Sequence, residues 1–151
     1  RRQRRRCIRD RLYIERASRR DAMRVVHQMA AALTAGDTLA VFPEGTTHDG
    51  QTLLPFHANL IQAAISAHAP ALPVALQYLD GASGAISDAP LFVGETTLLQ
   101  SIWRTLRADG LQACVHFGEP QSANNRERRT WAADLQQAVG AMLTADSASG
   151  R

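Results

Sequence analysis

The sequence of 151 residues contains no lysine and only two cysteines, Cys7 and Cys114. Two cysteines cannot form a disulfide framework, and neither has a second cysteine or a histidine at the spacing of zinc ligands. These shortages indicate a reducing compartment and a chain without a metal site. No apolar run approaches the roughly 18 residues needed to cross a membrane, so we expect no transmembrane segment within these residues.

The net charge of +3 is distributed unevenly. Residues 1–20 hold ten arginines against only Asp10 and Glu15, while the rest of the chain carries more acids than arginines. A dense arginine cluster attracts phosphate polyanions, either nucleic acid or the anionic surface of a bilayer. Base-stacking aromatic residues do not alternate with these arginines, and no nucleic-acid-binding motif follows them. We therefore expect no nucleic-acid partner and favour an anionic membrane surface.

Apolar residues make up 45% of the sequence and recur with the periods of helices and strands, which indicates one folded domain. Helical spacing predicts helices at residues 19–35, 56–69, 98–106 and 131–143. Short apolar runs predict buried strands at 38–42 and 72–79 and further strands at 91–93 and 111–117, with a surface loop at 80–88. Because strands alternate with helices, the expected fold is an α/β open sheet covered by helices.

Polar residues follow the predicted strand at 38–42, the place where ligands gather in open α/β sheets. The run consists of Phe42, Pro43, Glu44, Gly45, Thr46 and Thr47. Gly45 lets backbone N–H groups approach a ligand, the threonines offer hydroxyls, and Glu44 can accept hydrogen bonds from an alcohol or fix a neighbouring arginine. The alternative is an ordinary turn in which Glu44 is solvated.

Three blocks of the sequence resemble blocks of the glycerolipid acyltransferases, the 1-acylglycerol-3-phosphate acyltransferase family, in the family's order. They are 42–50 (FPEGTTHDG), similar to Phe-Pro-Glu-Gly-Thr-Arg-Ser; 12–16 (LYIER), similar to Phe-Ile-x-Arg; and 71–75 (ALPVA), similar to Val-Pro-Val-x-Pro. The resemblance implies a glycerolipid-acyltransferase-like domain at 12–144. A basic head at 1–11, which fits no family block, and a flexible tail at 145–151 would flank it.

The resemblance implies transfer of an acyl group from an acyl thioester, on coenzyme A or acyl carrier protein, to the free hydroxyl of a lysophospholipid. The first candidate acceptor is 1-acylglycerol-3-phosphate. No cofactor is implied beyond the acyl-donor substrate. Such an enzyme would be a peripheral protein at the cytoplasmic face of a membrane, the bacterial inner membrane in this case.

Two of the matched residues lie outside the central block. By the resemblance, Arg16 matches the arginine assigned to the acceptor phosphate, a role that suits a bidentate guanidinium. Pro73 matches the block thought to shape the acyl or thioester pocket. The structural alternatives are a solvated Arg16 within the basic stretch and an ordinary proline near a strand start.

Within the central block, Glu44 and Gly45 match the family's acceptor-binding pair, and Thr46 matches the threonine beside it. Thr47 stands where the family usually has an arginine. The loss of that cation leaves open how a phosphate would be held, and it hints at another acceptor, such as a lyso-ornithine lipid.

Acyl transfer to an alcohol needs a base, and the family uses a His-x-x-x-x-Asp block upstream of the Glu-Gly pair. Here the positions five residues after each histidine hold Ala32, Leu53, Gln62, Pro73 and Gln121. His48 beside Asp49 is a poor substitute, and His57 is expected at a helix start. We therefore assign no catalytic residue and expect the N-terminal third of the domain to be missing, which would leave apolar sheet surface exposed. The alternative function is a non-catalytic remnant that binds lipid or a membrane surface.

Overall fold

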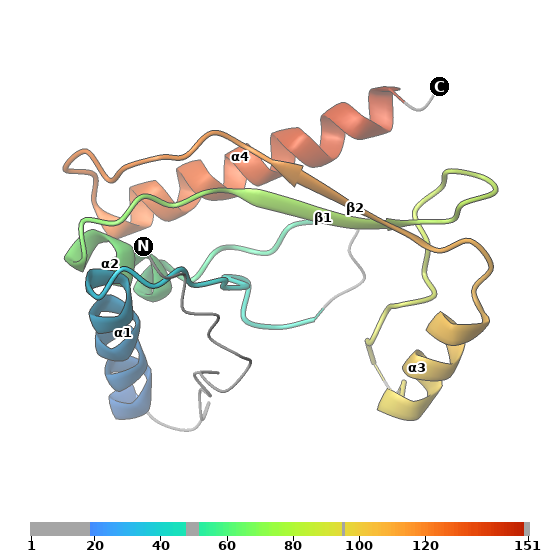
Figure 1. Ribbon diagram of the computed structural model, residues 1–151, viewed down its shortest axis with the longest axis horizontal. Coiled ribbons are helices and arrows are strands. Elements are labelled where there is room, and N and C mark those ends of the chain that lie inside the picture. The colour runs from blue at the N-terminus through green and yellow to red at the C-terminus, as the bar shows by residue number, and fades with distance from the viewer. Residues whose placement is uncertain (1–18, 48–51, 95, 150–151) are drawn as a thin grey trace, which may run out of the picture.

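The computed structural model describes residues 19–47, 52–94 and 96–149 (Figure 1). In chain order its elements are α1 (Arg19–Thr34), α2 (Ala58–Ser66), β1 (Val74–Leu79), α3 (Leu98–Arg107), β2 (Gln112–Phe117) and α4 (Arg128–Ser149). The helices predicted from the sequence are all present among these residues, and the strands predicted at 72–79 and 111–117 are present as well. The α/β class is therefore confirmed.

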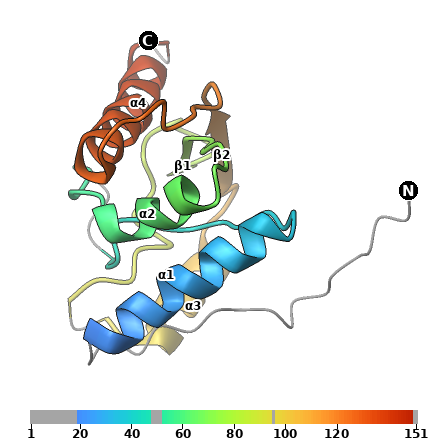
Figure 2. The same cartoon turned by 90° about the vertical axis from the view of Figure 1, so that its left-hand side faces the viewer.

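Two apolar clusters join three of the helices. The first, between α1 and α2, consists of Val25, Val26, Met29 and Ala63. The second, between α2 and α4, consists of Ile61, Trp131, Ala132 and Leu135. The short helix α2 therefore lies between α1 and α4, as Figure 2 shows. This packing fixes the start of α2, which carries part of the candidate site.

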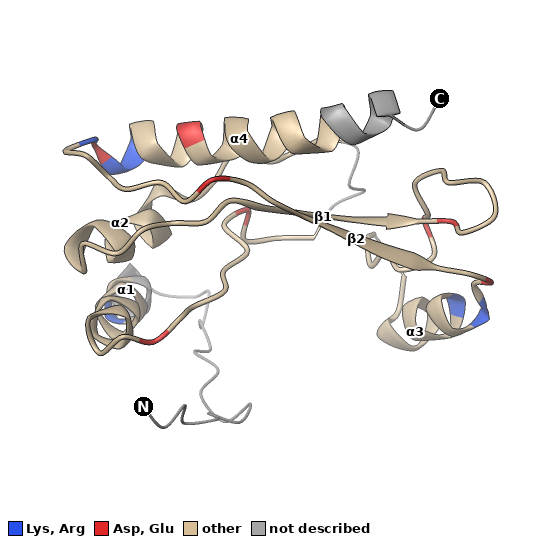
Figure 3. Cartoon of the chain, turned by 45° about the horizontal axis from the view of Figure 1, so that its top comes forward, with Lys and Arg blue, Asp and Glu red and all other residues tan. Residues whose placement is uncertain are grey.

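The described part of the sheet is a single antiparallel pair. Its register runs from Val74 opposite Phe117 to Leu79 opposite Gln112, and α4 runs along β1 (Figure 3). Ala75 is buried on one face of this pair. The opposite face carries the exposed side chains of Val74, Leu76, Tyr78, Val115 and Phe117.

This exposure corrects one expectation and confirms another. The sequence predicts a strand at 72–79 that is buried on both faces, and this is wrong, because the side chains of β1 alternate between covered and exposed. The exposed apolar sheet surface that the sequence predicts is present.

Two other predicted strands do not form. Residues 38–42 have no regular secondary structure and pair with no strand that the structure describes, and Val41 and Phe42 are exposed rather than buried. Residues 91–93 lie between two turns, since the N–H of Leu91 donates to the Asp88 carbonyl oxygen and the Val93 carbonyl oxygen accepts from the N–H of Thr96. A strand needs a neighbour for its backbone groups, and these groups have turn partners or no strand beside them.

The end of the chain is more helical than the sequence suggests. The backbone of α4 remains helical to Ser149, within the segment 145–151 predicted as a tail. The basic head at 1–11 lies outside the described residues. None of the helices within the described ranges combines the length and the apolar character that crossing a bilayer would require.

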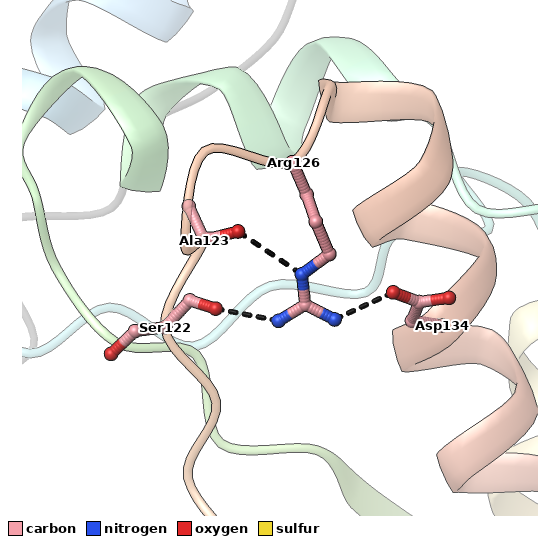
Figure 4. Close-up of polar contacts among 4 residues, drawn as sticks. All are labelled: Ser122, Ala123, Arg126 and Asp134. Carbon is pink, nitrogen blue, oxygen red and sulfur yellow. Dashed lines mark hydrogen bonds and ion pairs between the residues drawn. The ribbon is translucent and has the colours of Figure 1, made fainter.

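A single arginine ties the connection after β2 to α4 (Figure 4). The Nε of Arg126 donates to the Ala123 carbonyl oxygen at 3.0 Å, and its two terminal nitrogens donate to the Ser122 carbonyl oxygen and the Asp134 carboxylate. Its guanidinium also lies 5.7 Å from the ring centroid of the buried Trp131. The planar fork of arginine is required, because the acceptors lie in different directions.

We expect Arg126→Lys to lower the free energy of unfolding by about 1–2 kcal/mol, because one ammonium group cannot reach the three acceptors together. Arg129→Lys, at an exposed position of α4, is the matched control and should change the free energy by less than about 0.5 kcal/mol. Urea unfolding of both variants gives the comparison. Equal losses in the two variants would contradict the role of the fork.

Candidate functional site

A tight turn follows the segment 38–42. The N–H of Gly45 donates to the Phe42 carbonyl oxygen at 3.2 Å, which closes the turn, and Gly45 has a φ of +68°. Proline second and glycine fourth in this turn occupy positions that such turns favour. The turn is docked on α2, because the Pro43 carbonyl oxygen accepts from the N–H of His57 at 2.8 Å.

The side chain of Glu44 closes the same loop from the other side. Its Oε2 accepts a hydrogen bond from the N–H of Leu54 at 2.8 Å, and the side chain is half-buried. The alternative in which the Glu44 side chain is solvated is therefore wrong, since this carboxylate is held by the backbone N–H of a residue ten positions further along the chain. A fixed carboxylate is ready to accept a hydrogen bond from a substrate without first being ordered.

His57 is the residue of this site that the sequence does not reveal. It stands at the N-terminal cap of α2, as expected for a helix start, and its side chain makes no capping hydrogen bond. A Cβ added to Gly45 would lie 2.8 Å from both Cδ2 and Nε2 of the His57 imidazole. The imidazole thus lies against Gly45, and it reaches the turn from twelve positions along the chain with no motif to signal it.

The remaining residues of the turn face solvent. Phe42 is 82% exposed, and Thr46 and Thr47 are exposed too. The Thr46 hydroxyl donates to the Thr47 carbonyl oxygen at 3.5 Å, the outer limit of a hydrogen bond, so little binds it within the protein. The turn therefore presents an exposed aromatic ring and two hydroxyls beside an anchored carboxylate.

Pro73 lies directly before β1, where it is buried. Its carbonyl oxygen accepts from the N–H of Gly118, and a Cβ added to Gly118 would lie 2.9 Å from Cγ of Pro73 and 3.4 Å from Sδ of Met142. These contacts favour the structural alternative for Pro73, a packing role between the sheet and α4. Its assignment to an acyl or thioester pocket stays a prediction.

Two predicted features cannot be placed. Arg16 and the His48–Asp49 pair lie outside the described residues. Within the part of the chain that the structure describes, no three histidine, cysteine or acidic side chains gather as metal ligands would.

Comparison with known proteins shows the family of this chain. The sequence model of the family described as Acyltransferase matches residues 9–77, a stretch that contains all three blocks. The lyso-ornithine lipid O-acyltransferase of Pseudomonas aeruginosa is 36% identical over 129 residues, which are 85% of this chain and 48% of that protein. The chain belongs to the glycerolipid acyltransferase family. No solved structure matches it significantly.

Further relatives within this family carry two different names. The 1-acyl-sn-glycerol-3-phosphate acyltransferase of Neisseria gonorrhoeae is 31% identical over 137 residues, 90% of this chain and 53% of that protein. The lyso-ornithine lipid O-acyltransferase of Brucella abortus is 31% identical over 144 residues, 87% of this chain and 54% of that protein. This acyltransferase-family chain spans about half the length of the relatives that it matches.

Proposed function

We propose that the protein to which this chain belongs transfers an acyl group from a thioester of coenzyme A or acyl carrier protein to the free hydroxyl of a lysolipid. The observation that carries the proposal is the turn at 42–47, where the side chain of Glu44 is anchored to Leu54 and exposed Gly45 turns the backbone with a φ of +68°. Membership of the acyltransferase family supports the reaction class.

In the proposed reaction the acceptor hydroxyl oxygen attacks the thioester carbon. A base removes the hydroxyl proton as the new ester bond forms, and the thiolate of the donor leaves and is protonated. Glu44 would accept a hydrogen bond from the acceptor and hold it in place. The family's base is the histidine of a His-x-x-x-x-Asp block, and this sequence contains no such block.

Thr47 favours lyso-ornithine lipid over 1-acylglycerol-3-phosphate as the acceptor. The usual arginine of the block would pair with a phosphate, and threonine supplies only a neutral hydroxyl. An ornithine head group carries no phosphate that would need this cation. The relatives in Pseudomonas aeruginosa and Brucella abortus named as lyso-ornithine lipid O-acyltransferases support the same choice.

The reaction is tested with a chimera in which the part of the Pseudomonas aeruginosa relative upstream of its match precedes residues 12–151. Release of free thiol is measured with acyl-CoA or acyl carrier protein and each lysolipid in turn. We expect transfer by the chimera and none by the present chain alone. A folded but inactive chimera, beside an active relative, would contradict the proposal and favour a lipid-binding remnant.

In this chimera we expect Thr47→Arg to lower the KM for 1-acylglycerol-3-phosphate roughly tenfold, since a charge-assisted hydrogen bond contributes about 1.5–3 kcal/mol. The KM for lyso-ornithine lipid should not fall. Thr130→Arg, at an exposed position of α4, adds the same charge as a control. An equal effect of both substitutions would show that net charge, rather than position 47, sets the KM.

We also propose that the protein acts at the cytoplasmic face of the bacterial inner membrane as a peripheral protein. Its lysolipid acceptor resides in that bilayer, so the site has to reach the lipid surface. The arginine-rich residues 1–20 favour an anionic surface.

A further inference from the structure

Helix α3 turns its polar side toward the protein and its apolar side toward solvent. An ordinary surface helix buries its apolar stripe and exposes its polar side. In α3 the residue that is buried is Ser101, at 7% exposure, and Thr105 beside it is half-buried. The α3 apolar face points outward and consists of Leu98, Leu99, Ile102, Trp103 and Leu106.

Polar contacts on the inner side hold α3 in this orientation. The Thr105 hydroxyl donates to the carbonyl oxygens of Ser101 and Ala89, and Arg104 donates to the carbonyl oxygen of Asp88 at 2.8 Å. A capping box between Thr97 and Gln100 fixes the first turn. The bonds of Arg104 and Thr105 to residues 88–89 therefore set the outward direction of the apolar face.

The helix also stands apart from the rest of the protein. In Figure 1 it lies well away from α1, α2 and α4, and among the described residues it makes no extensive contact with another helix or strand. Leu99 is 79% exposed and Leu106 is 74% exposed. Removing these leucines from water would lower the free energy, and only something outside the described residues can do so.

The charges beside this face indicate what covers it. The last turn of α3 carries Arg104 and Arg107, visible in Figure 3, and the helix contains no acidic residue. The Arg107 guanidinium lies 5.4 Å from the ring centroid of Trp103. Arg107 therefore flanks the apolar stripe, whereas Arg104 is bonded to Asp88 on the inner side. An apolar stripe with a tryptophan and a flanking cation is the pattern of a helix that lies in the plane of a bilayer surface. A second copy of the chain would bring the same cations and no acid on α3.

We propose that the α3 apolar face docks the protein on a bilayer that carries anionic lipids, with Arg107 at the head groups and the leucines among the acyl chains. This inference rests on the proposed function in one respect, that the lipid acceptor lies in the bilayer. It makes α3 the element that enters the bilayer, whereas the arginine-rich residues 1–20 supply only attraction to the anionic surface.

The test uses the whole 151-residue chain and vesicles of phosphatidylcholine with or without phosphatidylglycerol. Trp131 is fully buried, so a blue shift of tryptophan emission on vesicle addition reports Trp103, the other of the two tryptophans. We expect this shift with anionic vesicles, its loss in Trp103→Phe, and weaker binding at high salt.

The deciding variant is Leu99→Glu with Leu106→Glu. We expect its vesicle partition constant to fall at least about tenfold, because two leucines lose their burial and two like charges meet anionic lipid. Met23→Glu, which places one new acid at a 58% exposed apolar position of α1, should change the constant less than about twofold. Because the leucines are exposed, the double variant should keep its unfolding temperature without lipid.

Three results would overturn the inference. Unchanged partitioning of the double variant would exclude α3, and so would complete loss of binding on deletion of residues 1–11. A lower unfolding temperature of the double variant without lipid would show that protein, not lipid, covers the face. Failure of the proposed function would give a different result. An inactive chimera, or the Glu44→Gln variant, would transfer little or no acyl group but would still bind vesicles through α3.

Discussion

Glu44→Gln is expected to lower acyl transfer by the chimera at least about 100-fold, as loss of one preorganised electrostatic contact does in other enzymes. A glutamine retains an oxygen that can accept from the N–H of Leu54, so the loop closure made by Oε2 of Glu44 survives. What disappears is the negative charge of the carboxylate. The variant therefore separates the chemistry of Glu44 from its structural contact.

Glu44→Ala removes both the charge and the acceptor for Leu54. If Glu44 binds the acceptor lipid, the glutamine and alanine variants should lose transfer alike. If Glu44 only closes the loop, the glutamine variant should retain transfer and the alanine variant should lose it. Glu119→Gln, at an exposed position after β2, controls for the loss of one negative charge.

Thiol release and urea unfolding are measured together for these variants. Unfolding of the glutamine variant should match that of the unsubstituted chimera, because Leu54 keeps its partner. Full transfer in both Glu44 variants would remove the block at 42–47 from the site.

The candidate site shows what local sequence can predict. Phe42, Pro43, Glu44 and Gly45 act through their neighbours in the chain, so their order alone predicts a turn with a positive φ at the glycine. The contact of Gly45 with His57 depends instead on how α2 packs against α1 and α4. Sequence spacing carries no information about that packing, so the sequence predicts His57 only at a helix start.

In the fold, too, the sequence predicts local structure but not how the elements pack against one another. The period of α3 predicts the helix correctly, because the period is a property of the segment itself. Which side of α3 faces inward depends on the carbonyl groups of Asp88, the last residue of the surface loop predicted at 80–88, and of Ala89 beside it. The run at 38–42 likewise has strand composition, but the structure describes no strand beside it for pairing.

Gly45→Ala should be the most damaging small substitution in the turn, because two separate costs coincide there. Alanine at a φ of +68° costs about 1–2 kcal/mol. The new methyl group would also lie 2.8 Å from the imidazole of His57, which has to move. We expect acyl transfer by the chimera to fall at least about tenfold, since a displacement of about 1 Å in a binding site can cost more than that.

Gly84→Ala isolates the backbone cost. Gly84 has the same φ of +68°, and nothing lies within 4 Å of the Cβ that alanine would add. The difference in free energy of unfolding between the two variants therefore measures the collision with His57. We expect Gly45→Ala to be the less stable of the two.

His57→Ala completes a double-mutant cycle with Gly45→Ala. If the imidazole lies against Gly45, removing it should relieve part of the cost of the new methyl group, with a coupling of about 0.5–3 kcal/mol in urea unfolding. Additive losses would mean that the imidazole swings away freely. If the double variant recovers stability but not acyl transfer, His57 has a second role in holding the acceptor. In that variant the loop is restored, and only the imidazole is missing.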